Sequence, residues 1–189
     1  MTKNIGYELS ESHSKGEGVI ATKQFYRNEI VMVGAIKEGN VEKNHSHASQ
    51  MGEFRHALHA GLISKVNHSC NPNCGIKVNA NGAHDFVAMK TIEVGDEITF
   101  DYAMRNFSVE YFPSQCCCGA TNCRGRITGW KDLPDSFKSD YLGFVAPYLI
   151  EMDSRKRRAD QSVGVTAMKP LRKSSEKELS TRETVNSAR

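Results

Sequence analysis

Short apolar runs separated by turn-forming residues dominate the first hundred residues. Residues 29–34 form one such run, which predicts a buried strand. Residues 75–79 and 85–89 flank Asn81-Gly82, a pair that tolerates positive φ, and this pattern predicts a β-hairpin. A turn at 94–96 then precedes another short strand at 97–100. The pattern predicts a mainly β core made of small sheets.

The pattern changes to a helical period towards the C-terminal end. Apolar residues recur at helical spacing and are expected to pack against the β core: Phe137, Tyr141, Phe144, Val145, Tyr148 and Leu149. Pro134 and Asp135 suit a helix start, and Pro147 interrupts the run, so we expect two short helices or one kinked helix. His56 and His59 would share one face of a helix. We expect residues 40–60 to be a polar connecting segment rather than a second metal site.

Composition indicates one domain with appendages. The chain has 189 residues, 39% of them hydrophobic, and a mean hydropathy of -0.51. No apolar run reaches the roughly 20 residues that cross a bilayer, and residues 1–14 lack the apolar stretch of a signal peptide. We therefore expect an intracellular protein with no membrane partner. A net charge of +3 is too small by itself to argue for nucleic-acid binding.

The tail 153–189 is polar and has no aromatic residue, so we expect it to be disordered. It begins with the basic run 155–158, Arg-Lys-Arg-Arg. This run could be a nuclear-import signal, a phosphate-binding arm that contacts nucleic acid, or simply a solvated tail. It favours the nucleus over the cytoplasm.

All six cysteines fall in two groups, Cys70 with Cys74 and residues 116–118 with Cys123. Thiols stay reduced inside cells, so clustered cysteines favour a metal over disulfides. On an extended segment Cys116 and Cys118 face the same way. A closed zinc site needs four ligands, so the fourth must come from the first group. Cys70 is the candidate, Cys74 is its competitor, and Cys117 could replace Cys118.

Three further strings occur in a fixed order: residues 15–18 (Lys-Gly-Glu-Gly), 67–73 (Asn-His-Ser-Cys-Asn-Pro-Asn) and 95–102 (Gly-Asp-Glu-Ile-Thr-Phe-Asp-Tyr). With the later cysteines, the chain resembles a SET-domain protein-lysine methyltransferase with a post-SET zinc motif, over about residues 5–130. The resemblance implies a mainly β SET-domain (β-clip) fold with a knot-like core. It divides the chain into a SET domain (1–103), a post-SET zinc-binding segment (104–130), a C-terminal helical segment (131–152) and the basic tail (153–189).

The resemblance also implies a set of site residues. S-adenosylmethionine would contact Lys15, Gly16, Gly18, Asn67, His68 and Tyr102. Tyr102 would be catalytic, and Phe100 would line the lysine channel with it. Phenylalanine at position 100 would leave room to go beyond monomethyl-lysine. One structural zinc ion would bind Cys70, Cys116, Cys118 and Cys123.

The family's usual substrate is a histone, so the expected partner is a protein with a target lysine. We expect the chain itself to be a monomer. The chain departs from the family pattern in three places: it has no cysteine-rich region before the domain, no Gly-Asn-x-x-Arg before Asn67, and no tyrosine in the 29–34 strand. The alternative function is a catalytically weak SET-like zinc module that binds chromatin or a protein partner.

Overall fold

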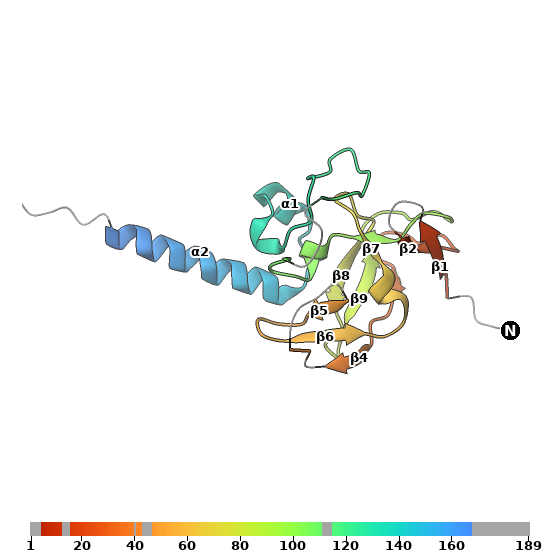
Figure 1. Ribbon diagram of the computed structural model, residues 1–189, viewed down its shortest axis with the longest axis horizontal. Helices are drawn as coiled ribbons and strands as arrows, with labels where there is room; N and C mark the ends of the chain where they lie inside the picture. The colour runs from red at the N-terminus through yellow and green to blue at the C-terminus, as the bar shows by residue number, and fades with distance from the viewer. Residues whose placement is uncertain (1–4, 13–15, 40, 43–46, 111–114, 168–189) are drawn as a thin grey trace, which may run out of the picture.

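Three small β-sheets form the body of the molecule, and two helices follow them (Figure 1). The computed structural model describes residues 5–12, 16–39, 41–42, 47–110 and 115–167. The strands are β1 (Tyr7–Ser12), β2 (Gly16–Ala21), β3 (Ile30–Met32), β4 (Ile36–Gly39), β5 (Ala48–Gln50), β6 (His56–His59), β7 (Asn67–His68), β8 (Cys74–Val78), β9 (His84–Ala88) and β10 (Thr99–Phe100). The helices are the 3₁₀ turns η1 (Gly61–Lys65), η2 (Tyr102–Met104) and η3 (Trp130–Asp132), and the α-helices α1 (Asp135–Asp140) and α2 (Pro147–Ala167).

The central sheet has the strand order β3-β9-β8-β10-β7. Strands β8 and β9 form the antiparallel hairpin that the sequence predicts. Strand β10 runs parallel to both of its neighbours and lies between β7 and β8, which precede it in the chain. This insertion aligns Thr99 with Asn67 and Phe100 with His68. Two motifs thirty residues apart in the sequence thus become adjacent strands.

The two smaller sheets are the β1-β2 hairpin and the order β4-β6-β5. His56 and His59 lie on strand β6, so the expectation that they share a helix face was wrong. Residues three apart on a strand point to opposite faces. His59 is accordingly buried, and His56 is half-buried.

One hydrophobic core joins the central sheet to the C-terminal segment. The core includes Phe25, Ile76, Phe86, Ile98, Phe100, Trp130, Tyr141, Val145 and Leu149. Contact is closest at Gly75, where a Cβ atom would lie 2.4 Å from the Cβ of Phe144. The adjacent Ile76 N–H donates to the Phe144 carbonyl at 2.8 Å. Phe144 and its neighbours therefore fix the C-terminal segment to the sheet.

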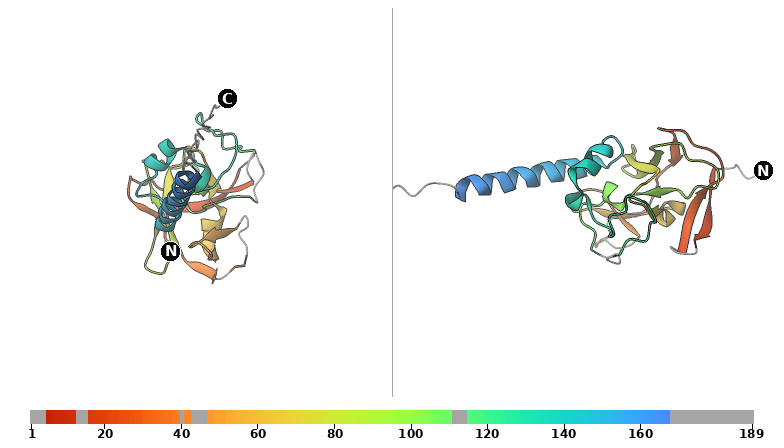
Figure 2. Two further views of the ribbon diagram at one scale, coloured as in Figure 1. Left: turned by 90° about the vertical axis from the view of Figure 1, so that its left-hand side faces the viewer. Right: turned by 90° about the horizontal axis from the view of Figure 1, so that it is seen from above.

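Pro147 is the first residue of α2, so the chain does form two helices around it. The prediction that the chain is disordered from residue 153 onward was wrong for residues 153–167. These residues continue α2, which projects from the body (Figures 1 and 2). Asp153 pairs with Lys138 at 3.0 Å and with Arg157 at 3.2 Å, and Leu149 is fully buried. Extending a helix that is already anchored costs much less than starting one. Residues 168–189 lie outside the described part.

Helix α2 has 21 residues, but its sequence is rich in polar and charged residues. Among the described residues, no helix is both long and apolar enough to cross a membrane.

Candidate active site and metal centre

The pairing of β7 with β10 brings the predicted site residues together. Tyr102 begins η2 just after β10, and the Asp101 carboxylate caps this turn by accepting the Ala103 N–H at 3.1 Å. The ring centroid of Tyr102 lies 5.3 Å from that of His68 and 5.0 Å from that of Phe100. The Tyr102 hydroxyl donates to the Val66 carbonyl at 3.4 Å. Burial raises the pKa of Tyr102, so its phenol is neutral and can donate a hydrogen bond.

The Gly-x-Gly segment of β2 lies against Asn67. A Cβ atom on Gly18 would lie only 2.9 Å from Asn67 Nδ2 and from Glu97 Oε1, so no larger residue fits without a shift. Asn67 Nδ2 donates to the Glu17 carbonyl at 3.0 Å and to Glu97 Oε1 at 2.9 Å. Both amide hydrogens are therefore committed, and the acceptor Oδ1 points the other way.

A small cavity of about 170 Å³ adjoins Gly18 and Glu97. Glu97 was not among the predicted site residues, although it belongs to the 95–102 string that carried the resemblance. Lys15, which was predicted to contact the cofactor, lies outside the described residues.

Four sulfur atoms converge beside this site. The Sγ atoms of Cys70, Cys116, Cys118 and Cys123 all lie within 4.8 Å of one another. The Cys70 and Cys116 sulfurs are 3.9 Å apart. Zinc–thiolate bonds of about 2.3 Å in a tetrahedron put neighbouring sulfurs about 3.8 Å apart, so the group fits a tetrahedral ion. Cys74 is buried in β8 outside the group, and Cys117 is exposed.

Backbone N–H groups surround the sulfurs. Cys70 N–H points to Cys118 Sγ at 3.5 Å, Arg124 N–H to Cys70 Sγ at 3.5 Å and Gly125 N–H to Cys123 Sγ at 3.4 Å. Burial would raise the pKa of Cys118, but the N–H groups of Cys70 and Ala120 and the thiols of Cys116 and Cys123 together outweigh burial and lower that pKa to about 7. Burial raises the pKa of Cys116 to about 11 and that of Cys70 further. The thiols of Cys70 and Cys116 would therefore ionise beside Cys118 only around a cation.

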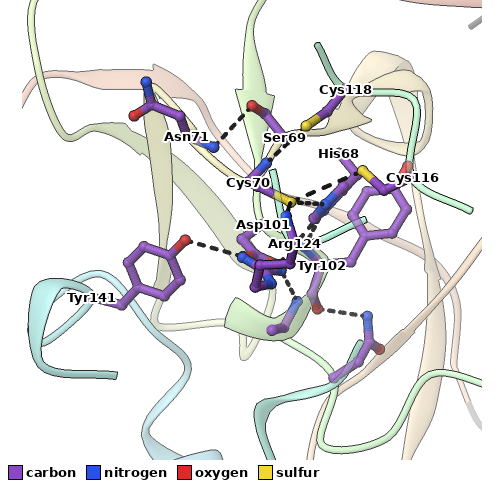
Figure 3. A network of polar contacts seen from close by, with 12 residues as sticks. His68, Ser69, Cys70, Asn71, Asp101, Tyr102, Cys116, Cys118, Arg124 and Tyr141 are labelled. Atoms are coloured by element: carbon purple, nitrogen blue, oxygen red, sulfur yellow. Dashed lines mark hydrogen bonds and ion pairs between the residues drawn. The ribbon is translucent and has the colours of Figure 1, made fainter. Parts of the chain in front are cut away.

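A network of polar contacts links the sulfurs to Tyr102 (Figure 3). His68 Nε2 lies 3.4 Å from Cys70 Sγ, and His68 Nδ1 accepts the Tyr102 N–H at 3.3 Å. Asp101, which is fully buried, lies 2.7 Å from Arg124 Nη1 and accepts the Tyr141 hydroxyl at 3.0 Å. We call Asp101, Arg124, Tyr141 and His68 the Asp101 network.

Three of these residues were missed by the sequence reasoning. Asp101 belongs to the 95–102 string, and Arg124 directly follows Cys123 of the four-cysteine group, so both had a local signal. Tyr141 was expected only to pack in the core. Its hydroxyl partner comes from a segment forty residues earlier, which the sequence pattern does not indicate.

A second buried polar cluster lies between β6, β9 and α2; we call Ser49, His59, His84 and Tyr148 the histidine cluster. The Ser49 hydroxyl lies 3.0 Å from His59 Nδ1, and the His84 N–H donates to His59 Nε2 at 3.1 Å. The two imidazole rings stack with centroids 5.1 Å apart. Burial, aided by the nearby Arg105 charge, lowers the pKa of His59 to about 4, and burial also lowers that of His84 well below its usual value.

Comparison with known proteins agrees with this geometry. The model of the SET domain family matches residues 16–103. The histone-lysine N-methyltransferase Set2 of Drosophila melanogaster is 31% identical over 150 residues, which cover 69% of this chain and 6% of that protein. The histone-lysine N-methyltransferase SETD2 of Homo sapiens is 30% identical over 141 residues, covering 65% of this chain and 5% of that protein.

The fold also matches a solved structure. The crystal structure of KRYPTONITE in complex with mCHG DNA and SAH aligns with a TM-score of 0.50 and 24% identity, over 64% of this chain and 28% of that one. This chain spans only a small part of the length of the relatives it matches. It is a SET-domain protein, with the domain at residues 16–103 and, after it, a four-cysteine cluster consistent with a post-SET zinc motif.

Proposed function

We propose that this chain is an S-adenosylmethionine-dependent protein-lysine N-methyltransferase that acts on a histone. The observation that carries the proposal is the convergence of Gly18, Asn67, His68 and Tyr102 around the β7–β10 pair. The names of the relatives, all histone-lysine N-methyltransferases, support the reaction and the substrate class. We also propose that the protein works in the nucleus, where histones are, and as a monomer.

Asn67 and the glycine segment would bind the cofactor. The fixed amide of Asn67 presents its Oδ1 acceptor, which suits the ammonium group of the amino-acid part. The bare backbone at Gly18 allows close approach. We also propose that Lys15 and Gly16 contact the cofactor, as the family resemblance implies. When bound, S-adenosylmethionine supplies an electrophilic methyl group on a sulfonium.

Tyr102 and Phe100 would hold the substrate lysine in its neutral, reactive form. A free lysine has a pKa near 10.4, and its amine attacks only when neutral. Apolar walls disfavour the ammonium form, and Phe100 is fully buried beside the Tyr102 ring. The neutral Tyr102 phenol would orient the amine through a hydrogen bond and hold it in line for transfer.

The four cysteines would hold one structural zinc ion. Its place is between the Asn67–Cys70 segment and the post-SET segment, so it would fix residues 104–130 over the cofactor. No catalytic step passes through the metal in this proposal.

A groove of about 400 Å³ lies where the β5–β6 turn meets the post-SET segment, and it suits a basic peptide. Glu53 and Glu110 lie on it together with the apolar Phe107 and Met152. Asn106 connects this groove to the active site, because its amide donates to the Tyr102 carbonyl at 3.0 Å. Glu53 is already paired with Arg155 at 2.7 Å, so the exposed carboxylate of Glu110 is the one that would attract the lysine- and arginine-rich tail of a histone.

The α2 helix supports a nucleic-acid contact only weakly. Two of its four consecutive basic residues are already paired within the chain, Arg155 with Glu53 at 2.7 Å and Arg157 with Asp153 at 3.2 Å. Lys156 and Arg158 are exposed, and they would be the ones to meet a phosphate backbone.

The variant Tyr102→Phe tests the proposed reaction. Methyl transfer from labelled cofactor to a panel of histones should fall about 10²–10³-fold, because the orienting hydroxyl is lost. The thermal midpoint and cofactor affinity should stay near those of the wild type. Tyr26→Phe is the matched control, since Tyr26 is 62% exposed and is not one of the proposed site residues. A wild-type chain that binds no cofactor, or a Tyr102→Phe variant with full turnover, would contradict the proposal and favour a SET-like binding module.

Phe100 leads to a prediction about the product. We expect the wild type to give di- or trimethyl-lysine under excess cofactor, because phenylalanine leaves the space that a tyrosine hydroxyl and its bound water would fill. Phe100→Tyr should shift the product towards monomethyl-lysine. Mass spectrometry of a methylated histone peptide measures both, and monomethyl product alone from the wild type would refute the idea.

A further inference from the structure

Arg124 contacts two parts of the site at once. Its backbone N–H points to Cys70 Sγ at 3.5 Å, and it directly follows the ligand cysteine Cys123. At its other end, Nη1 lies 2.7 Å from Asp101 Oδ2. The two side chains are 11% and 0% exposed. Arg124 thus spans the distance from the sulfur cluster to the residue that precedes Tyr102.

Asp101 in turn holds the backbone on both sides of Tyr102. Its Oδ1 caps η2 by accepting the Ala103 N–H at 3.1 Å and lies 3.5 Å from His68 Nδ1. That same ring nitrogen accepts the Tyr102 N–H at 3.3 Å. Because a ring nitrogen that accepts the Tyr102 N–H has no proton to give to Asp101, Asp101 acts on Tyr102 from the next residue in the chain, through the backbone of the η2 turn that it caps.

Packing alone does not explain a buried ion pair at this position. Removing two charges from water costs several kcal/mol per ion, and well-packed apolar residues often stabilise a protein as well. An ion pair can also fix the orientation of the groups around it. The phenol of a methyl-transfer site needs a fixed position, because a displacement of a catalytic group by about 1 Å can lower the rate about 10²-fold.

We propose that Arg124 is a positioning residue for Tyr102, acting through Asp101. The Arg124–Asp101 pair couples the folding of the four-cysteine cluster to the position of the Tyr102 phenol. Tyr102 is therefore correctly placed only when the post-SET segment has folded. This inference rests on the proposed function and adds a residue that acts without touching cofactor or substrate.

Arg124→Gln tests the link, because it keeps a polar side chain but removes the charge and the guanidinium that meets Asp101. We expect kcat to fall about 10- to 100-fold while KM for S-adenosylmethionine and for the histone stays within about 3-fold. Zinc content by elemental analysis should remain one ion per chain. Arg124→Lys should recover part of kcat. Arg126→Ala is the matched control, since Arg126 is exposed two residues further on, and it should behave as the wild type.

A readout independent of turnover comes from the backbone of Tyr102. Protein labelled with ¹⁵N-tyrosine gives an amide signal for each of the six tyrosines, and Tyr102→Phe identifies the one of interest by its disappearance. Because the Tyr102 N–H donates to His68, its signal should move in Arg124→Gln and stay in place in Arg126→Ala.

Asp101→Asn is the second variant, and it removes the same ion pair without touching the sulfur loop. If Arg124→Gln loses its metal, Asp101→Asn should still keep zinc and show the same fall in kcat and the same signal shift. Unchanged kcat and an unmoved Tyr102 signal in zinc-loaded Asp101→Asn or Arg124→Gln would overturn the inference. If the wild type methylates no histone, the proposed function fails, whereas the amide signal still decides whether the link exists.

Discussion

The Asp101 network and the histidine cluster are both buried and polar, but the first contains ionised side chains and the second contains neutral ones. The first contains an ion pair between Asp101 and Arg124 and adjoins four sulfur atoms whose arrangement fits a tetrahedral metal ion. The second holds His59 and His84 in their neutral forms, and the His59 ring accepts the backbone N–H of His84 and lies 3.0 Å from the Ser49 hydroxyl. Buried charge is costly, so an interior that only needs to be filled keeps its groups neutral. The buried Asp101–Arg124 ion pair lies next to the residues expected to bind metal and transfer a methyl group.

Metal removal should produce the largest difference between the two clusters. Structural zinc contributes about 10–16 kcal/mol of apparent binding free energy in small sites, so a strong chelator or Cys118→Ser should unfold the post-SET segment. Hydrogen exchange should accelerate in residues 115–130 and at Tyr102, while β6 and β9 around the histidine cluster stay protected. Methyl transfer should fall to background.

Cys117→Ser is the control for that experiment, because Cys117 is exposed and lies outside the group of four. It should keep both metal and activity. Full activity in metal-free protein would show that the sulfur cluster does not support the active site.

Lowering the pH should reduce the free energy of unfolding by less than metal removal does, and it should act through the histidine cluster. The pKa of His59 is about 4 in the folded chain and near 6.5 when unfolded. Below pH 6.5 the unfolded state therefore binds more protons, so the stability contribution present at neutral pH is lost as the pH falls from 6.5 towards 4. The loss from His59 is at most about 3 kcal/mol, and His84 adds to it in the same direction.

Urea unfolding at pH 7.5, 6.0 and 5.0 measures this dependence. His59→Gln should flatten the curve over that range, since it removes one of the two groups that must take up a proton. His47→Gln is the control, because His47 is exposed and should leave the slope unchanged. An equally steep curve in His59→Gln would place the acid sensitivity elsewhere.

Sequence reasoning succeeded where a short string has one dominant local outcome. The hairpin of β8 and β9 followed from alternation around Asn81-Gly82, and the SET resemblance followed from three strings in order. It failed where the outcome depends on what a segment meets. The 153–167 region has a disorder-like composition, but Asp153 meets Lys138, and α2 continues beyond it. His56 and His59 fit a helix period, but strand pairing with β4 and β5 decided their conformation.

The amino-acid sequence by itself determined the chemical groups of this protein: a carboxamide, an imidazole, a phenol and more thiols than one ion can use. It left open which thiols belong together, and the tertiary structure favours Cys70 and Cys118 over Cys74 and Cys117 by bringing four sulfurs within 4.8 Å. The threading of β10 between β7 and β8 decided that these groups meet, and it also created the Arg124–Asp101 contact. Such contacts join residues far apart in the chain, and local propensity carries no information about them because their free energy arises only once the core has closed.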